Sequence, residues 1–189
     1  KVFDLNKKYN TTIQNDEDVQ RNVNWKLSKV VWNNLFNYGE NNTIDFTSLN
    51  GIVGIFGKNY SGKSSVVDSL LYILFNSTSK NERKNLNVIN QNKQDATGEA
   101  VITVGNKEYR VVRTSEKYIK KLKGEETLEA KTMVEFSVKD LITDEVLELN
   151  GTTRNETDKI IRNHFGTLED FLLTSMSSQL GALQFISEG

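Results

Sequence analysis

The segment from Gly57 to Ser64, GKNYSGKS, constrains the fold of this chain more than any other. It consists of a glycine, four further residues and Gly-Lys-Ser, which is the spacing of a phosphate-binding loop (P-loop) between a strand and a helix. Backbone N–H groups of such a loop enclose phosphate oxygens, the lysine reaches the terminal phosphates, and the serine hydroxyl coordinates magnesium. The motif therefore predicts an α/β fold with a site for ATP or GTP and Mg²⁺.

The residues on either side of the loop have the pattern that the motif requires. Before it, Ile52 to Phe56 form a short apolar run, which predicts a buried strand. After it, apolar residues recur at helical spacing, which predicts a helix over about 62–75. The N-terminus of that helix would direct its positive dipole end toward bound phosphates.

The rest of the chain reads as hairpin-linked strands followed by helices. Residues 1–24 are polar and weakly patterned, and we expect an N-terminal extension or arm there, with one domain over 25–189. Strands are predicted at 25–32, 43–46, 99–104, 107–113, 132–138 and 146–149. Helices are predicted at 153–166, which opens with a capping box, and at 168–173. The charged stretch 116–129 is expected to be a loop or an extended hairpin tip.

Composition limits the kind of protein this can be. The chain has 189 residues, no cysteine and a net charge of −1, so disulfides and thiolate metal sites are excluded. No apolar run approaches about 18 residues, so we expect no membrane span and a cytoplasmic protein. Nucleic-acid contact would need a local basic patch, and the candidates are 117–123 and the cluster Lys80, Arg83 and Lys84. Because acidic residues are interspersed, we favour solvated charged loops.

Four stretches, in order, resemble the N-terminal half of an ABC-type ATPase head from the SbcC and SMC group. Residues 29–39 are similar to the opening strand and turn of that group, and 51–65 to its P-loop, with Asn59 at the position of its loop asparagine. Residues 108–113 resemble its "Y-x-I-x-R" strand, and 171–186 its glutamine segment, with Gln179 as the glutamine. The resemblance is closest to the large ATPase subunit of a double-strand-break repair or recombination exonuclease, including phage-type versions.

The resemblance implies a head lobe with a mixed sheet and an antiparallel β subdomain. It assigns cofactor binding to Gly57, Asn59, Ser61, Gly62, Lys63, Ser64 and Ser65. It assigns the magnesium ion to Ser64 and Gln179, and catalysis to Lys63 and Gln179, with Gln184 as the alternative glutamine. Tyr60 stands where many members have glycine.

The same resemblance implies several partners. The C-terminal half of the head and its coiled coil would lie outside these 189 residues and would supply the signature motif and the catalytic glutamate. Further partners would be a second head in an ATP-bridged dimer, a nuclease subunit and double-stranded DNA, in the host cytoplasm for a phage protein. A membrane is not among the expected partners.

Other functions fit parts of the pattern. One is an SMC-like or RecF-like ATPase that organises DNA without a nuclease. Less favoured is a transporter nucleotide-binding subunit, because the spacing from Lys63 to Gln179 is long for that class. Also less favoured is a metabolic kinase, because a kinase would need no partner half, whereas the resemblance implies one. The single histidine, His164, is expected to be a structural helix-end residue, and Trp25 and Trp32 are expected in the core.

Overall fold

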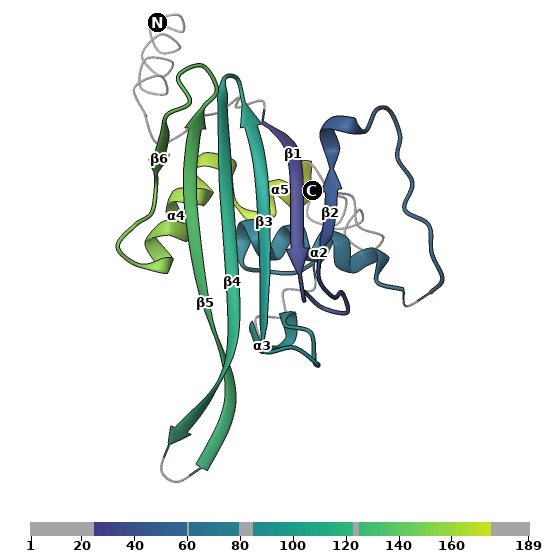
Figure 1. Cartoon of the computed structure of the whole chain (residues 1–189), viewed down its shortest axis with the longest axis vertical. Coiled ribbons are helices and arrows are strands. Elements are labelled where there is room, and N and C mark those ends of the chain that lie inside the picture. The colour runs from purple at the N-terminus through teal and green to yellow at the C-terminus, as the bar shows by residue number, and fades with distance from the viewer. Residues whose placement is uncertain (1–24, 60, 80–84, 123–124, 175–189) are drawn as a thin grey trace, which may run out of the picture.

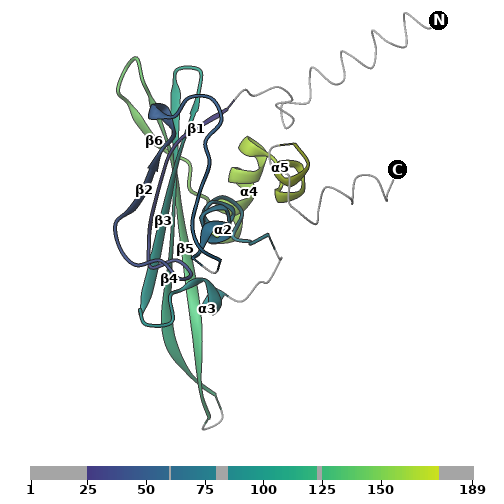
Figure 2. The same ribbon diagram turned by 90° about the vertical axis from the view of Figure 1, so that its right-hand side faces the viewer.

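The computed structural model describes residues 25–59, 61–79, 85–122 and 125–174, in which a six-stranded sheet carries helices on one face (Figures 1 and 2). The strands lie in the order β2-β1-β3-β4-β5-β6, and each neighbouring pair is antiparallel. The strands are β1 (Lys26–Asn33), β2 (Asn42–Asp45), β3 (Asp95–Val104), β4 (Lys107–Leu122), β5 (Glu125–Asp140) and β6 (Val146–Glu148). The helices are η1 (Phe46–Ser48), α2 (Lys63–Phe75), α3 (Asn85–Val88), α4 (Arg154–Phe165) and α5 (Leu168–Thr174).

The predicted hairpins are confirmed, and three of their strands, β3, β4 and β5, are longer than expected. Strands β3 and β4 meet at a two-residue turn in which Gly105 has a φ of 57°, a conformation that glycine adopts at little cost. The charged stretch 116–129 is an extended hairpin tip, because β4 and β5 stay paired from Lys107↔Asp140 to Leu122↔Glu125. This hairpin projects beyond the helix layer (Figure 1).

The predicted strand at Ile52–Phe56 is wrong. These residues belong to no strand and lie outside the sheet, and Ile52 and Phe56 are 104% and 94% exposed. An apolar run indicates that side chains are to be buried, but it does not indicate what buries them. Within the part of the chain that the structure describes, no strand pairs with this segment, so the sheet is antiparallel rather than mixed.

The core lies between the inner face of the sheet and helices α2 and α4. Its fully buried members include Leu35, Ile73, Ile102, Phe136 and Ile161. Helix α2 approaches β3 closely at Gly98, where a Cβ would overlap the side chain of Ile73. A larger residue at position 98 would therefore push α2 off the sheet.

Helix α4 begins and ends as its sequence predicts. The Glu156 N–H donates to Thr153 Oγ1 at 3.3 Å, and Glu156 Oε2 accepts from the Thr153 N–H at 3.2 Å, which is the predicted capping box. At the other end, Gly166 is the C-cap with a φ of 85°. His164 packs against Tyr109 and Phe136, with Nδ1 2.9 Å from the Ile160 carbonyl oxygen, as expected of a structural residue.

The guanidinium of Arg113 on β4 is completely buried and joins three elements. Its Nη2 donates to Asp158 Oδ1 of α4 at 2.7 Å, and its Nε donates to the Ile73 carbonyl of α2 at 2.9 Å. The Asp158 carboxylate is also largely buried and lies 3.7 Å from Arg154 Nε. The pair therefore fixes both helices to the same strand.

Replacing Asp158 should leave a buried charge without its counter-ion. We expect Asp158→Ala to lower the free energy of unfolding by about 3 kcal/mol, since an unpaired buried cation is costly. Chemical denaturation would measure the loss. Glu126→Ala is the matched control, because Glu126 pairs with Lys121 on the surface and should change stability by less than about 1 kcal/mol. Equal losses in the two variants would contradict the prediction.

Candidate phosphate-binding site

Gly62 and the first turn of α2 form an anion-attracting helix terminus. Gly62 is the N-cap with a φ of 89°, and it provides no side chain to cap the free N–H groups. The first turn of α2 contains no acidic residue, so the positive end of the helix dipole is not neutralised from within the helix. Phosphate is the ligand that such a terminus prefers.

The P-loop closes around the side chain of Lys63. The Lys63 ammonium donates to the carbonyls of Gly57 at 2.9 Å and Lys58 at 2.7 Å, and the Ser61 N–H donates to the Lys58 carbonyl at 3.2 Å. A Cβ at Gly57 would lie 2.6 Å from Ser61 Oγ, so a larger residue would displace this hydroxyl. The loop therefore folds around a cation that lies beside the free N-terminus of α2, and this cation would turn from the loop carbonyls toward a bound phosphate.

The structure brings together Gly57, Ser61, Gly62 and Lys63, four of the predicted site residues. Asn59 and Ser64 are exposed beside them, and Ser64 occupies the first turn of α2, where its hydroxyl would hold magnesium. Ser65 lies on the same turn, with its N–H donated to the Gly62 carbonyl at 3.0 Å. Tyr60, Gln179 and Gln184 lie outside the described residues, so their assignments stay predictions.

The turn between β1 and β2 also contacts the loop, although no role in the site was predicted for its residues. The Tyr38 hydroxyl donates to the Gly62 carbonyl at 3.0 Å, and a Cβ at Gly62 would overlap the side-chain amide of Asn37. The two positions are 24 residues apart along the chain, so no local pattern could have predicted this contact. The turn therefore forms a second wall beside the P-loop.

The lysines of the β4–β5 hairpin are already paired. Lys120 pairs with Glu129 at 3.0 Å and Lys121 with Glu126 at 2.7 Å, and the hydrogen bond from Lys120 lowers the pKa of Glu129. The ammonium of Lys117 donates to the carbonyls of Asn90 and Gln91. These pairs favour the interpretation of the hairpin as a solvated charged surface and not as a phosphate-binding patch. The other candidate cluster, Lys80, Arg83 and Lys84, lies outside the described residues.

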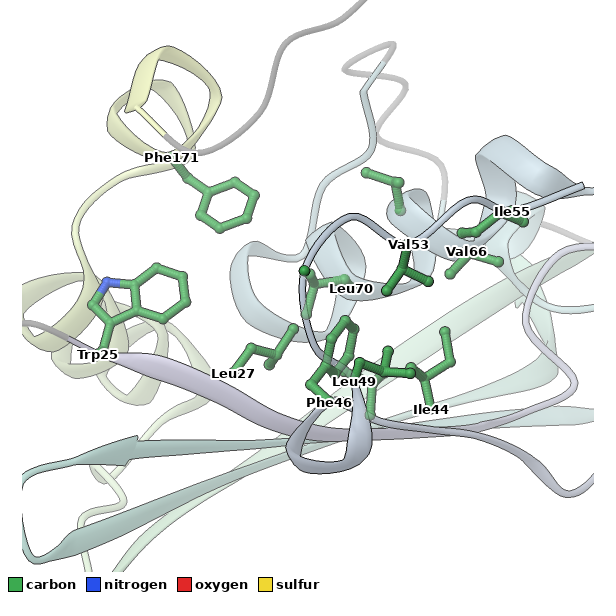
Figure 3. Close-up of a pocket in the computed structure, with 13 residues that line it drawn as sticks. Trp25, Leu27, Ile44, Phe46, Leu49, Val53, Ile55, Val66, Leu70 and Phe171 are labelled. Carbon is green, nitrogen blue, oxygen red and sulfur yellow. The ribbon is translucent and has the colours of Figure 1, made fainter.

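An apolar cavity of about 950 Å³ lies between the sheet, α2 and the segment 52–56 (Figure 3). Val53 and Ile55 line it from one side, and Leu70 of α2 and Phe46 line it from the others. The complete lining is Trp25, Leu27, Val30, Ile44, Phe46, Leu49, Gly51, Val53, Ile55, Val66, Val67, Leu70 and Phe171. Since none of these side chains is charged, the cavity differs from the phosphate site, which contains the Lys63 ammonium.

The described residues contain no group of three or more His, Asp or Glu side chains placed to hold a metal ion. Among their helices, none is long and apolar enough to cross a membrane.

Comparison with known proteins identifies the family. Residues 29–188 match the family model described as "AAA domain" (AAA_23). The chain belongs to this family of P-loop ATPases. This confirms the predicted P-loop ATPase, and the α/β fold agrees with it, while the narrower SbcC assignment goes beyond what the match shows.

The matches to individual proteins cover only part of the length of those proteins. "Uncharacterized protein R555" of Acanthamoeba polyphaga mimivirus is 29% identical over 199 residues, which cover 98% of this chain and 14% of that protein. The chain thus spans about a seventh of the length of this relative. Two structures of the recombination mediator protein RecF, with ATP and with ATPrS, are 14% identical and cover 56% of this chain, with TM-scores of 0.41 and 0.42. The matched regions make up 27% and 26% of the respective RecF chains.

Gly62 offers a test of the loop geometry. We expect Gly62→Ala to weaken MgATP binding at least about 10-fold, because a Cβ there is strained at positive φ and overlaps the Asn37 amide. Calorimetric titration with a slowly hydrolysed ATP analogue would measure it. Gly105→Ala is the control, since Gly105 also has a positive φ (57°) but open space around its Cβ position. Equal affinities in the two variants would contradict the assigned geometry.

Proposed function

We propose that this chain is the nucleotide-binding lobe of an SbcC-type or SMC-type ATPase head, which binds MgATP at 57–65 and hydrolyses it only with a C-terminal half. The observation that carries the proposal is the exposed segment 52–56, which leads directly into the P-loop. In a complete site, this segment would be expected inside the protein, with both faces covered.

The side chains of the segment alternate as those of a strand do. Val53 and Ile55 line the apolar cavity and are half exposed, whereas Ile52 and Phe56 face solvent almost completely (Figure 3 labels the first two). Burial of one such side chain contributes about 1.5–3 kcal/mol, so leaving two of them in water forfeits several kcal/mol. A second lobe that supplies a neighbouring strand and an apolar cover would recover this energy. The same lobe would hold the P-loop from its open side.

The chemistry divides between the lobes in the same way. Phosphoryl transfer needs positive groups around the phosphates, a magnesium ion and a residue that orients the attacking water. Lys63, Ser64 and the free N-terminus of α2 provide the first two requirements. We assign the sensing of metal and water to Gln179, and the catalytic carboxylate to the C-terminal half. ATP would then bridge two such heads.

For the biological role, we propose a DNA repair or recombination ATPase whose closure controls a nuclease partner on double-stranded DNA ends. The support is the resemblance of 29–39, 51–65, 108–113 and 171–186 to that group, together with the P-loop ATPase family match. Because Lys120 and Lys121 are paired with carboxylates, we assign no DNA contact to the hairpin.

Lys63 tests the nucleotide site. We expect Lys63→Ala to reduce MgATP affinity at least about 10-fold and to abolish ATP-dependent dimerisation of the full-length protein, since it removes the cation that meets the terminal phosphates. Equilibrium titration and analytical ultracentrifugation would measure these quantities. Lys139→Ala, a surface lysine paired with Asp144, should behave like the unmodified protein. Unchanged affinity and dimerisation in Lys63→Ala would refute the assignment.

The segment 52–56 tests the missing half. We expect its backbone amides to exchange hydrogen at least about 10-fold more slowly when the C-terminal half is added, because a new strand would protect them. Hydrogen exchange with mass spectrometry would detect the change. The turn 141–145 at the far end of the sheet is the internal control and should not change. Protection confined to that turn, or none at all, would count against a shared sheet.

A further inference from the structure

We propose that Asn37, on the turn between β1 and β2, is a ligand of the nucleotide phosphates and that its side-chain amide adds a donor from outside the P-loop. The inference rests on the proposed function, since it concerns the same site. Its basis is a contact between the Asn37 amide and Gly62, the residue that precedes the first free N–H groups of α2.

The position of Asn37 is suited to a ligand. Its amide touches Gly62 so closely that a Cβ there would overlap both the nitrogen and the oxygen of the amide. Asn37 is nevertheless exposed, so its polar atoms are open to a ligand. An Asn side chain has two N–H donors, and phosphate oxygens accept only. The amide therefore supplies N–H donors, as the neighbouring helix terminus also does.

The turn that carries Asn37 is rigidly held from three sides. The Asn34 N–H donates to the Gly39 carbonyl, the Phe36 N–H to the Val88 carbonyl and the Asn90 N–H to the Asn34 carbonyl, each at 2.8 Å. Asn34 and Phe36 both have positive φ values, 56° and 55°, which the surrounding contacts maintain.

Tyr38 links the same turn to the P-loop and to the core. Its carbonyl accepts from Asn90 Nδ2 at 2.9 Å, its hydroxyl donates to Gly62, and its ring packs edge-on against buried Trp32 at 5.3 Å. Asn37 is therefore placed before any ligand arrives, and little conformational entropy is lost when it binds one.

The MgATP affinity of variants at position 37 should depend on the charge and the hydrogen-bond donors of the new side chain. We expect Asn37→Ala to weaken MgATP binding about 5-fold to 20-fold, as loss of a hydrogen bond to a charged group would. Asn37→Asp keeps the shape but replaces the donor by an anion, so it should bind more weakly than Asn37→Ala. Asn37→Arg should restore or exceed the original affinity, because a cation would face the phosphates.

The experiment is calorimetric titration of the full-length protein with Mg²⁺ and a slowly hydrolysed ATP analogue, with thermal unfolding of each variant as a check on folding. Asn106→Ala and Asn106→Arg are matched controls, since Asn106 is an exposed turn asparagine between β3 and β4. Both controls should keep the original affinity. A ranking of Arg, Asn, Ala and Asp from tightest to weakest at position 37 supports the proposal.

Two outcomes would overturn it. Original affinity in Asn37→Ala shows that the amide binds nothing, and equal weakening by Ala and Arg shows that Asn37 only packs against Gly62. If Asn37→Ala fails to fold, the isosteric Asn37→Asp decides, because unchanged affinity in that variant excludes a phosphate contact. Absence of MgATP binding by the unmodified protein overturns the proposed function together with this inference, whereas the other outcomes leave the proposed function intact.

Discussion

The buried guanidinium of Arg113 holds together the three elements on which the phosphate site depends. It spans β4, α2 and α4 through Ile73 and Asp158, and it lies 6.0 Å from the ring of Tyr72. One nitrogen, Nη1, is buried without a hydrogen-bond partner among the described residues, so the group is costly to bury and is held only because its other bonds are well made. Any shift of α2 along the sheet would break them.

Helix α2 is thus anchored at both ends by distant parts of the chain. Near its C-terminal end, the Ile73 carbonyl accepts from Arg113, and at its N-cap the Gly62 carbonyl accepts from the Tyr38 hydroxyl. The P-loop lies directly before the second anchor. Its position therefore depends on β1, on β4 and on the turn braced by Asn90, and the eight residues of the motif do not determine it alone.

Sequence reasoning succeeded where the signal is local. The periodic apolar residues of α2 and the capping box at Thr153 depend on neighbours three or four residues away, and both helices were predicted correctly. The contacts of Arg113 with Asp158 and of Tyr38 with Gly62 span 45 and 24 residues, so a single sequence contains no sign of them. The strand expected at 52–56 was wrong because an apolar pattern predicts that side chains are buried, but it does not specify which element covers them.

The exposed segment 52–56 also has a consequence for aggregation. A short apolar window rich in β-branched residues is prone to pair with other chains while it is uncovered. In this chain, Gly51, Gly54 and Gly57 interrupt the window at every third position, and Lys58 follows it with a charge. Glycine is a poor strand former, so these residues weaken intermolecular pairing. Gly57 thus serves the P-loop and, together with Gly51 and Gly54, also reduces the tendency of the exposed segment to aggregate.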